Sequence, residues 1–130
     1  MRTLRKEITA CMDAEVRAVE PDRSYELVFR FSDGFMGFQG HFPGHAILPA
    51  FVQLLMGQCA VNMRTASHWS LRKVERGKFL KTIEPNQPVT VRWQEQPGAG
   101  TLRCTFTLLV DGEKAAVFTA EFASEEDHHA

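Results

Sequence analysis

The chain has few cysteines, almost no net charge and no long hydrophobic segment. Its three cysteines, Cys11, Cys59 and Cys104, are odd in number and widely spaced, which predicts neither a disulfide framework nor a metal site of paired cysteines. A formal net charge of −1 gives no overall attraction for nucleic acid, because nucleic-acid-binding proteins usually carry a basic excess. We expect no metal ion, no cofactor and no nucleic-acid partner.

No segment has the length or composition of a membrane span or a secretory signal. The most apolar stretch, residues 46–61, contains two glutamines and a proline and is shorter than the roughly 20 residues that cross a bilayer. Acidic residues interrupt the N-terminal stretch before any apolar run long enough for a signal peptide. We therefore expect a cytoplasmic protein with no membrane contact.

The composition is that of a soluble globular protein, with 44% hydrophobic and 24% charged residues. A length of 130 residues suits one domain with one core. Because internal repeats, low-complexity tracts and linkers are absent, we expect a single domain over residues 1–130, with a frayed tail at about 124–130.

Alternation of apolar and polar residues predicts strands at 24–31, 89–94, 101–110 and 115–122. The Asp111-Gly112 pair predicts a tight hairpin between the last two strands. Gly77 and Lys78 are expected to begin another extended piece.

Residues 50–67 have a helical pattern that begins after Pro49 and is at first apolar nearly all round. A helix of this kind is normally covered by other elements. An antiparallel sheet that covers one apolar helix buries both, so the sequence predicts the α+β class.

The segment before this helix, GHFPGHAILPA, places two histidines in a turn rich in proline and glycine. An imidazole titrates near neutral pH, which makes His41 a candidate for proton transfer; the alternative is a histidine that only stabilises the turn. His45 is a second candidate, with an exposed turn residue as its alternative. No carboxylate occurs between Gly34 and Arg72, so the sequence provides no acidic partner nearby.

Gly40-His41-Phe42-Pro43-Gly44, then Ile47-Leu48-Pro49 and the apolar helix, resemble the active-site segment of the β-hydroxyacyl-acyl carrier protein dehydratases. Members of that family have the hot-dog fold, an antiparallel sheet wrapped around one long central helix. Lys78-Phe79 and the hairpin at 109–114 resemble the family's C-terminal sheet, and the resemblance covers about residues 20–123.

The resemblance implies that His41 exchanges the α-carbon proton of a 3-hydroxyacyl thioester. The backbone amides at the helix start would polarise the thioester carbonyl, with Ala50 in place of the family's glycine. Unpaired helix-start amides and the helix dipole do stabilise negative charge on oxygen. The substrate-binding residues implied around this site are Phe42, Gly44, Pro49, Ala50, Phe51, Gln53, Leu55 and Gln58.

The sequence departs from the family at Leu55, the position where the family has the Asp or Glu that handles the departing hydroxyl. Gln53 and Gln58 are the only polar side chains in the first half of the helix, and amides form hydrogen bonds but are not general acids. They either contact substrate or bond to the backbone or a dimer partner. Gln53 belongs to a Val-Gln-Leu stretch that also resembles a dehydratase-like branch from gene clusters for specialised lipids.

Two further groups of residues have alternative interpretations. Phe31, Phe35, Phe38, Phe42 and Phe51 either form the core or line an acyl tunnel, and Cys59 is expected in the core. Five positive charges occur within ten residues, and they either form a solvated surface or attract an acidic acyl carrier protein: Arg72, Lys73, Arg76, Lys78 and Lys81.

The sequence thus predicts a 3-hydroxyacyl-(acyl carrier protein) dehydratase or dehydratase-like protein of fatty acid or specialised lipid synthesis. The alternatives are a non-catalytic module that binds acyl groups or carrier proteins, which Leu55 favours, and a thioesterase, which the missing carboxylate disfavours. In the family, active sites lie between two subunits. A homodimer is therefore the expected minimum, or a heterodimer with a paralogous subunit that supplies the missing acid.

Overall fold

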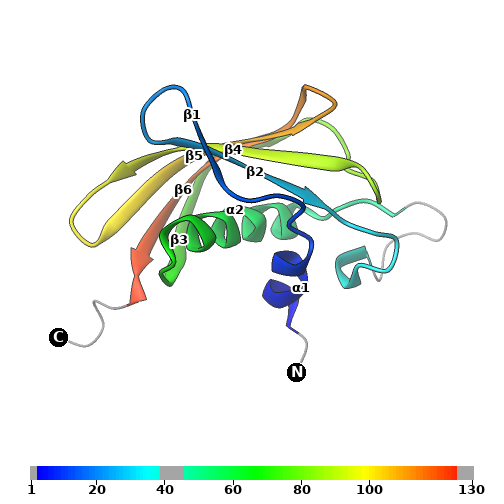
Figure 1. Ribbon diagram of the computed structural model, residues 1–130, viewed down its shortest axis with the longest axis horizontal. Coiled ribbons are helices and arrows are strands. Elements are labelled where there is room, and N and C mark those ends of the chain that lie inside the picture. The colour runs from blue at the N-terminus through cyan, green and yellow to red at the C-terminus, as the bar shows by residue number, and fades with distance from the viewer. Residues whose placement is uncertain (1–2, 39–45, 126–130) are drawn as a thin grey trace.

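The computed structural model describes residues 3–38 and 46–125, which form one antiparallel sheet and two α-helices (Figure 1). The helices are α1 (Leu4–Ala10) and α2 (Ala50–Thr65), and Met36–Phe38 form a short 3-10 helix, η1. The strands are β1 (Arg17–Val19), β2 (Ser24–Arg30), β3 (Trp69–Phe79), β4 (Pro88–Pro97), β5 (Thr101–Val110) and β6 (Glu113–Ser124). The predicted α+β class is confirmed.

The six strands lie in the order β1-β2-β4-β5-β6-β3, and every neighbouring pair is antiparallel. Tight turns join β4, β5 and β6. Asp111 and Gly112, between β5 and β6, have φ values of +53° and +78°, the left-handed pair that a two-residue type I′ hairpin requires. The chain crosses over after α2, so β3 pairs with β6 and forms one edge of the sheet.

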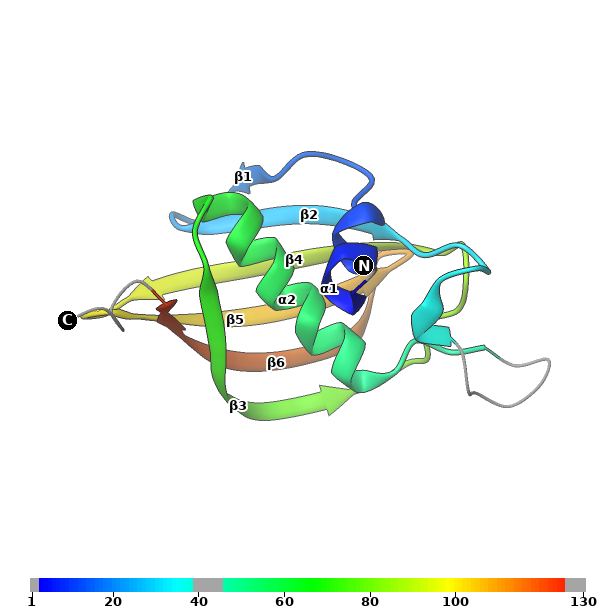
Figure 2. The ribbon, with the colours of Figure 1, turned by 90° about the horizontal axis from the view of Figure 1, so that it is seen from below.

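Figures 1 and 2 show α2 lying across one face of the sheet, with α1 beside it. The side chains that fill the space between helix and sheet include fully buried residues from four strands and from α2 itself: Leu27, Phe29, Val52, Met56, Val91, Trp93, Phe106 and Phe122. An apolar core therefore holds α2 against the sheet. No helix in the described ranges is long and apolar enough to cross a bilayer.

Gly57 sets how closely α2 approaches the sheet. A Cβ at this position would lie 3.0–3.3 Å from ring carbons of Phe106 on β5, nearer than ordinary van der Waals contact. Glycine therefore permits a helix-to-sheet distance that other residues would increase.

An ion pair fixes the C-terminal end of α2. Arg64 donates from Nε to Glu95 Oε2 at 2.7 Å and from Nη2 to Glu95 Oε1, and Trp93 Nε1 donates to Glu95 Oε2 at 3.0 Å. The guanidinium also lies 4.7 Å from the ring centroid of Tyr25. Glu95 is buried, and these donors offset the cost of removing its charge from water.

Two predictions about the elements need correction. The sequence predicted one long helix, but the structure has two, because α1 was missed in a stretch of mixed composition. Gly77 and Lys78 were expected to begin an extended piece, but they lie near the end of β3, which begins at Trp69. Charged side chains and register shifts interrupt the alternation of this edge strand.

We expect Gly57→Val to lower the free energy of unfolding by about 1–3 kcal/mol, because the added side chain must displace Phe106. Urea or thermal unfolding followed by circular dichroism measures the change. Gly34→Val is the matched control, since a Cβ at Gly34 meets no atom within 4 Å. Equal stability of Gly57→Val and wild type would show that α2 has room to move away from the sheet.

Candidate active site

The predicted catalytic histidine, His41, lies outside the described residues, as do Phe42, Gly44 and His45. The description resumes at Ala46, and residues 46–49 lead directly into α2. The residues that come after the two histidines in the sequence therefore adjoin the start of this helix.

Two hydrogen bonds fix the junction between this segment and α2. The N–H of Leu48 donates to the carbonyl of Ile83 at 2.8 Å, and the side-chain amide of Gln53 donates from Nε2 to the carbonyl of Leu48 at 3.1 Å. The loop after β3, the segment before α2 and the first turn of α2 therefore meet at Leu48.

The first turn of α2 leaves two backbone donors available. Val52 and Gln53 donate their N–H groups to the carbonyl of Pro49, at 3.1 and 3.2 Å. Pro49 provides no side-chain cap, and the N–H groups of Ala50 and Phe51 have no hydrogen-bond partner within residues 3–38 and 46–125. Such donors, together with the helix dipole, favour a carbonyl oxygen that gains negative charge.

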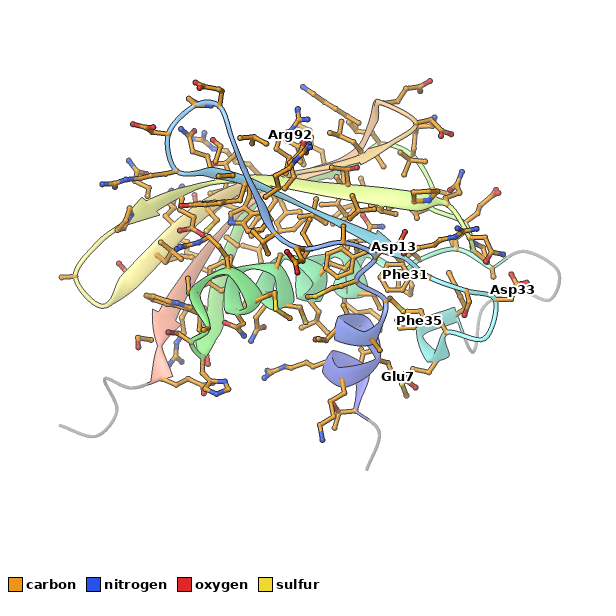
Figure 3. The ribbon with its side chains drawn as sticks, viewed as in Figure 1. Glu7, Asp13, Phe31, Asp33, Phe35 and Arg92 are labelled. Atoms are coloured by element: carbon orange, nitrogen blue, oxygen red, sulfur yellow. The ribbon has the colours of Figure 1, made fainter. Side chains whose placement is uncertain are left out.

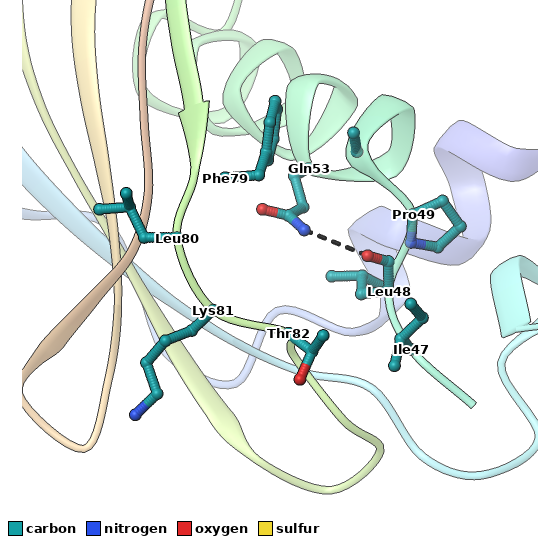
Figure 4. A pocket seen from close by; sticks show the side chains of 9 residues that line it. Ile47, Leu48, Pro49, Gln53, Phe79, Leu80, Lys81 and Thr82 are labelled. Atoms are coloured by element: carbon teal, nitrogen blue, oxygen red, sulfur yellow. Dashed lines mark hydrogen bonds between the residues drawn. The ribbon is translucent and has the colours of Figure 1, made fainter. Parts of the chain in front are cut away.

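A pocket of about 280 Å³ opens at this helix start (Figure 4). Its walls come from the segment before α2, the first turn of α2 and the end of β3 with the loop that follows: Ile47, Leu48, Pro49, Ala50, Gln53, Phe79, Leu80, Lys81 and Thr82. Pro49, Ala50 and Gln53 were predicted to bind substrate, and Lys81 was predicted to contact a carrier protein. Phe79, Leu80 and Thr82 were not predicted as wall residues, because only tertiary packing brings their segment to α2.

Three other residues predicted to bind substrate do not line this pocket. Phe51 projects outward with 56% of its surface exposed, and Leu55 is half-buried and packs against the core. Gln58 is buried, and its amide donates to the carbonyl of Trp69 at 3.0 Å. For Gln58 the structure thus gives a backbone partner.

No carboxylate among the described residues lines the pocket. Glu26, on β2, accepts hydrogen bonds from Arg92 and Arg17, and Arg92 lies on the face of the sheet opposite α2 (Figure 3). These bonds, first from Arg92 and then from Arg17, hold the pKa of Glu26 below its usual value of 4.5. Glu84, in the loop between β3 and β4, has an exposed side chain.

The basic residues of the predicted carrier-protein surface lie on β3 and just after it, and all are exposed. Lys73 pairs with Glu75 at 3.1 Å, and Lys81, at the pocket, pairs with Glu113 at 2.8 Å. Their role in carrier-protein binding stays a prediction.

The predicted phenylalanines that precede residues 39–45 in the sequence belong to the core. Phe31, Phe35 and Phe38 are buried, and the rings of Phe31 and Phe35 lie 4.6 Å apart between centroids (Figure 3). Cys59 is also buried, and burial raises the pKa of its thiol. The described residues contain no group of three or more His, Cys, Asp or Glu side chains that could hold a metal ion.

A larger hollow of about 500 Å³ lies between α1 and the C-terminal half of α2. It contains none of the residues predicted for catalysis or substrate binding. The pocket at the start of α2, although smaller, is the one next to the unpaired amides, and we take it as the candidate active site.

The model of the ApeI-like family (ApeI dehydratase) matches residues 17–120 of the chain. The chain belongs to the ApeI-like dehydratase family. The predicted kinship to hot-dog dehydratases is thereby confirmed, and with Leu55 in place of the usual acid this chain is a divergent member. Among curated proteins, none matches the sequence significantly.

Several solved structures are similar in fold to this ApeI-like chain. The dehydratase heterocomplex ApeI:P from Xenorhabdus doucetiae matches with a TM-score of 0.66 and 18% identity, over 85% of this chain and 96% of that one. A hypothetical thioesterase from Streptococcus pneumoniae, solved with coenzyme A, matches with a TM-score of 0.67 and 7% identity, over 93% of both chains. The TT0310 protein from Thermus thermophilus matches with a TM-score of 0.64 and 14% identity, over 95% and 99%. These likenesses show the hot-dog fold.

We expect Glu26→Gln to reduce stability at neutral pH by about 1 kcal/mol, because charge-assisted hydrogen bonds to partly exposed arginines are lost. The folded-state pKa of Glu26 lies below its usual value, so its contribution is present above pH 4.5 and disappears as the pH falls through the folded pKa. Urea unfolding at several pH values should therefore show the gap between wild type and variant closing in acid. Glu84→Gln is the exposed control, and a gap that does not vary with pH would contradict this assignment.

Proposed function

We propose that this ApeI-like chain is a 3-hydroxyacyl thioester dehydratase, acting on acyl groups presented by an acyl carrier protein. The observation that carries the proposal is the start of α2, where the N–H groups of Ala50 and Phe51 have no partner among the described residues and Ala50 lines a largely apolar pocket. Five residues separate the HFPG segment from this helix start in the sequence.

In the proposed reaction, the thioester carbonyl oxygen accepts hydrogen bonds from the helix-start amides. His41 removes a proton from the α-carbon, and the developing enolate charge is stabilised by those amides. The bond between C3 and its hydroxyl oxygen then breaks, and the hydroxyl leaves as water after taking up one proton. The product is the enoyl thioester. Ala50 retains the backbone donor that the family's glycine provides.

The second proton transfer is where this chain differs from its family. Leu55 cannot donate a proton, and no carboxylate of the described residues lines the pocket. His41 therefore returns to the hydroxyl the proton that it took from carbon. A missing general acid typically lowers the rate by about 10²–10⁴-fold, so the expected enzyme is slow but active.

We further propose that the chain works as a dimer through the free edge of β3. Large apolar side chains are exposed on β3, just after it and at the start of α2: Val74 (37%), Phe79 (45%), Leu80 (55%) and Phe51 (56%). An edge strand with such side chains favours pairing with another chain. Phe79 and Leu80 also line the pocket, so a partner on this edge would adjoin the site.

The partner subunit is a second copy of this chain or a paralogue. The ApeI:P structure from Xenorhabdus doucetiae, a dehydratase heterocomplex, supports the second option. A paralogue with an Asp or Glu at the equivalent helix position would supply the acidic side chain that is missing at position 55.

The second candidate function is a non-catalytic module that binds acyl groups or carrier proteins. The half-buried Leu55 favours it, because the site then needs no acid. A thioesterase is less favoured although thioesterases share the fold, since the pocket walls offer no carboxylate to activate water.

Replacement of His41 tests the proposed activity. We expect wild type to convert a 3-hydroxyacyl-acyl carrier protein thioester to the enoyl product, and His41→Ala to reduce the rate by at least about 10²-fold. Mass spectrometry of the carrier protein measures substrate and product. His68→Ala, at an exposed histidine after α2, is the control and should retain wild-type activity.

The products of the same assay separate the candidate functions. Free acid would support hydrolysis, and unchanged substrate with tight association would support the binding module. Comparison with His45→Ala assigns the activity to one histidine of the turn. Full activity in His41→Ala would refute the proposed mechanism.

Restoring a carboxylate tests whether the missing acid limits the rate. We expect Leu55→Glu to accelerate dehydration by up to about 10²–10⁴-fold, because in the proposed dimer the carboxylic acid of one subunit can protonate the hydroxyl that departs in the site of the other. Leu55→Gln is the matched control: it has the same shape and polarity without an acidic proton. If both variants fold and react at the wild-type rate, the acid is not what this site lacks.

A further inference from the structure

Gln53 has a side-chain amide whose orientation is fixed. Its Nε2 donates to the carbonyl of Leu48 at 3.1 Å, and Leu48 donates its own N–H to Ile83 at 2.8 Å. The reversed amide would set two oxygen atoms against each other, because the Leu48 carbonyl is an acceptor only. The free end of the amide is therefore Oε1, an acceptor.

This acceptor is buried and lacks a donor. Gln53 is 3% exposed, and within residues 3–38 and 46–125 its Oε1 has no hydrogen-bond partner. Gln53 also lines the pocket, and Figure 4 shows Oε1 pointing away from Leu48 toward the wall that carries Phe79 and Leu80. Since buried acceptors in folded proteins are nearly always paired, the donor is to be sought in what fills the pocket.

The described pocket walls do not supply that donor. The ammonium of Lys81 is bonded to Glu113 at 2.8 Å, and the side chains of Ile47, Leu48, Pro49, Phe79 and Leu80 are apolar. Thr82 has a hydroxyl but makes no hydrogen bond to Gln53. An occupant that presents one donor to an otherwise apolar pocket would complete the site.

We infer that Gln53 is a specificity residue, whose Oε1 accepts a hydrogen bond from the 3-hydroxyl of a hydroxyacyl thioester. The inference rests on the proposed function, which places the thioester carbonyl at the amides of Ala50 and Phe51. Gln53 lies two to three residues further along α2, about 3–4.5 Å in helical rise. A hydroxyl on C3 is three bonds from the carbonyl carbon, within reach of this span.

The hydroxyl fits better than the first amide of a pantetheine arm. That amide nitrogen is one bond further from the carbonyl carbon and lies on the sulfur side, which leads back toward the carrier. The hydroxyl lies on the acyl side, which enters the apolar pocket.

Such a contact distinguishes substrate from product. The enoyl thioester and the saturated acyl thioester have no donor at C3, so either would leave Oε1 unpaired. Gln53 would therefore favour binding of the hydroxyacyl group and release of the dehydrated product. Because the Nε2 end is already engaged, Gln53 binds the hydroxyl without protonating it.

Binding of two matched ligands to the full chain tests the inference. The probes are the pantetheine amide of 3-hydroxyoctanoic acid, each enantiomer separately, and that of octanoic acid, which lacks only the hydroxyl. We expect wild type to bind one hydroxylated enantiomer about 5- to 100-fold more tightly by isothermal titration calorimetry. In Gln53→Met, which keeps the shape of the side chain but not the acceptor, the ratio should fall to about 1.

Two further variants complete the test. Gln58→Met removes the other buried glutamine of α2, which does not line the pocket, and should keep the wild-type preference. Gln53→Leu is a second variant without the acceptor and should also lower the ratio to about 1, so the test does not depend on one variant that folds poorly.

Each result has one meaning. Equal affinity of wild type for the hydroxylated and plain ligands would overturn the inference, with water as the only donor to Gln53, and would leave the proposed function standing. A preference that survives in Gln53→Met, or disappears equally in Gln58→Met, would also overturn it. If wild type binds neither ligand, the proposed function itself fails.

Discussion

The structure depends on the close packing of an apolar helix against a curved antiparallel sheet. Gly57 allows α2 to approach Phe106, and the Arg64–Glu95 pair fixes the far end of the helix. With its middle and C-terminal end held, the N-terminus of α2 lies beside the loop that follows β3. The hydrogen bonds at Leu48 then close the junction, and the pocket forms where these segments meet.

This arrangement explains how a site can persist after the loss of an acidic side chain. The helix-start amides belong to the backbone, and their direction is set by the packing of α2, not by the residue at position 55. Leu55 packs against the core, so its substitution leaves the fold and the oxyanion-binding geometry in place. In the proposed dehydration, the step that Leu55 affects is proton delivery to the leaving hydroxyl. Binding and carbonyl polarisation are separable from that step, which is why an enzyme and a binding module both remain compatible with the same helix.

Sequence patterns predicted those elements whose side chains have a regular pattern of burial. Strand β5 was predicted with its observed bounds, and the prediction of α2 differs only by two extra residues at the C-terminal end. Both predictions succeeded because alternation and apolar runs follow directly from burial. Most of edge strand β3 escaped prediction, because its exposed, charged residues follow neither the strand nor the helix pattern. In the candidate site, the prediction of Pro49, Ala50 and Gln53 came from the resemblance of this segment to a known family. Phe79 and Leu80 were not, since nothing local in the sequence indicates that they face α2.

The exposed apolar residues at the edge of β3 link the pocket to the proposed pairing of subunits. Leu80 and Phe79 are large, about half exposed, and part of the pocket wall. Covering apolar side chains of this size lowers the free energy of the protein. A partner that pairs with β3 would cover them and deepen the pocket at the same time. The proposed function would give one physical explanation for the free edge of β3, for the missing acid and for the acceptor of Gln53 that has no partner among the described residues. In that proposal the single chain holds the carbonyl and hydroxyl ends of the substrate, and a second subunit closes the remaining side. Subunit pairing and substrate binding would thus depend on the same surface.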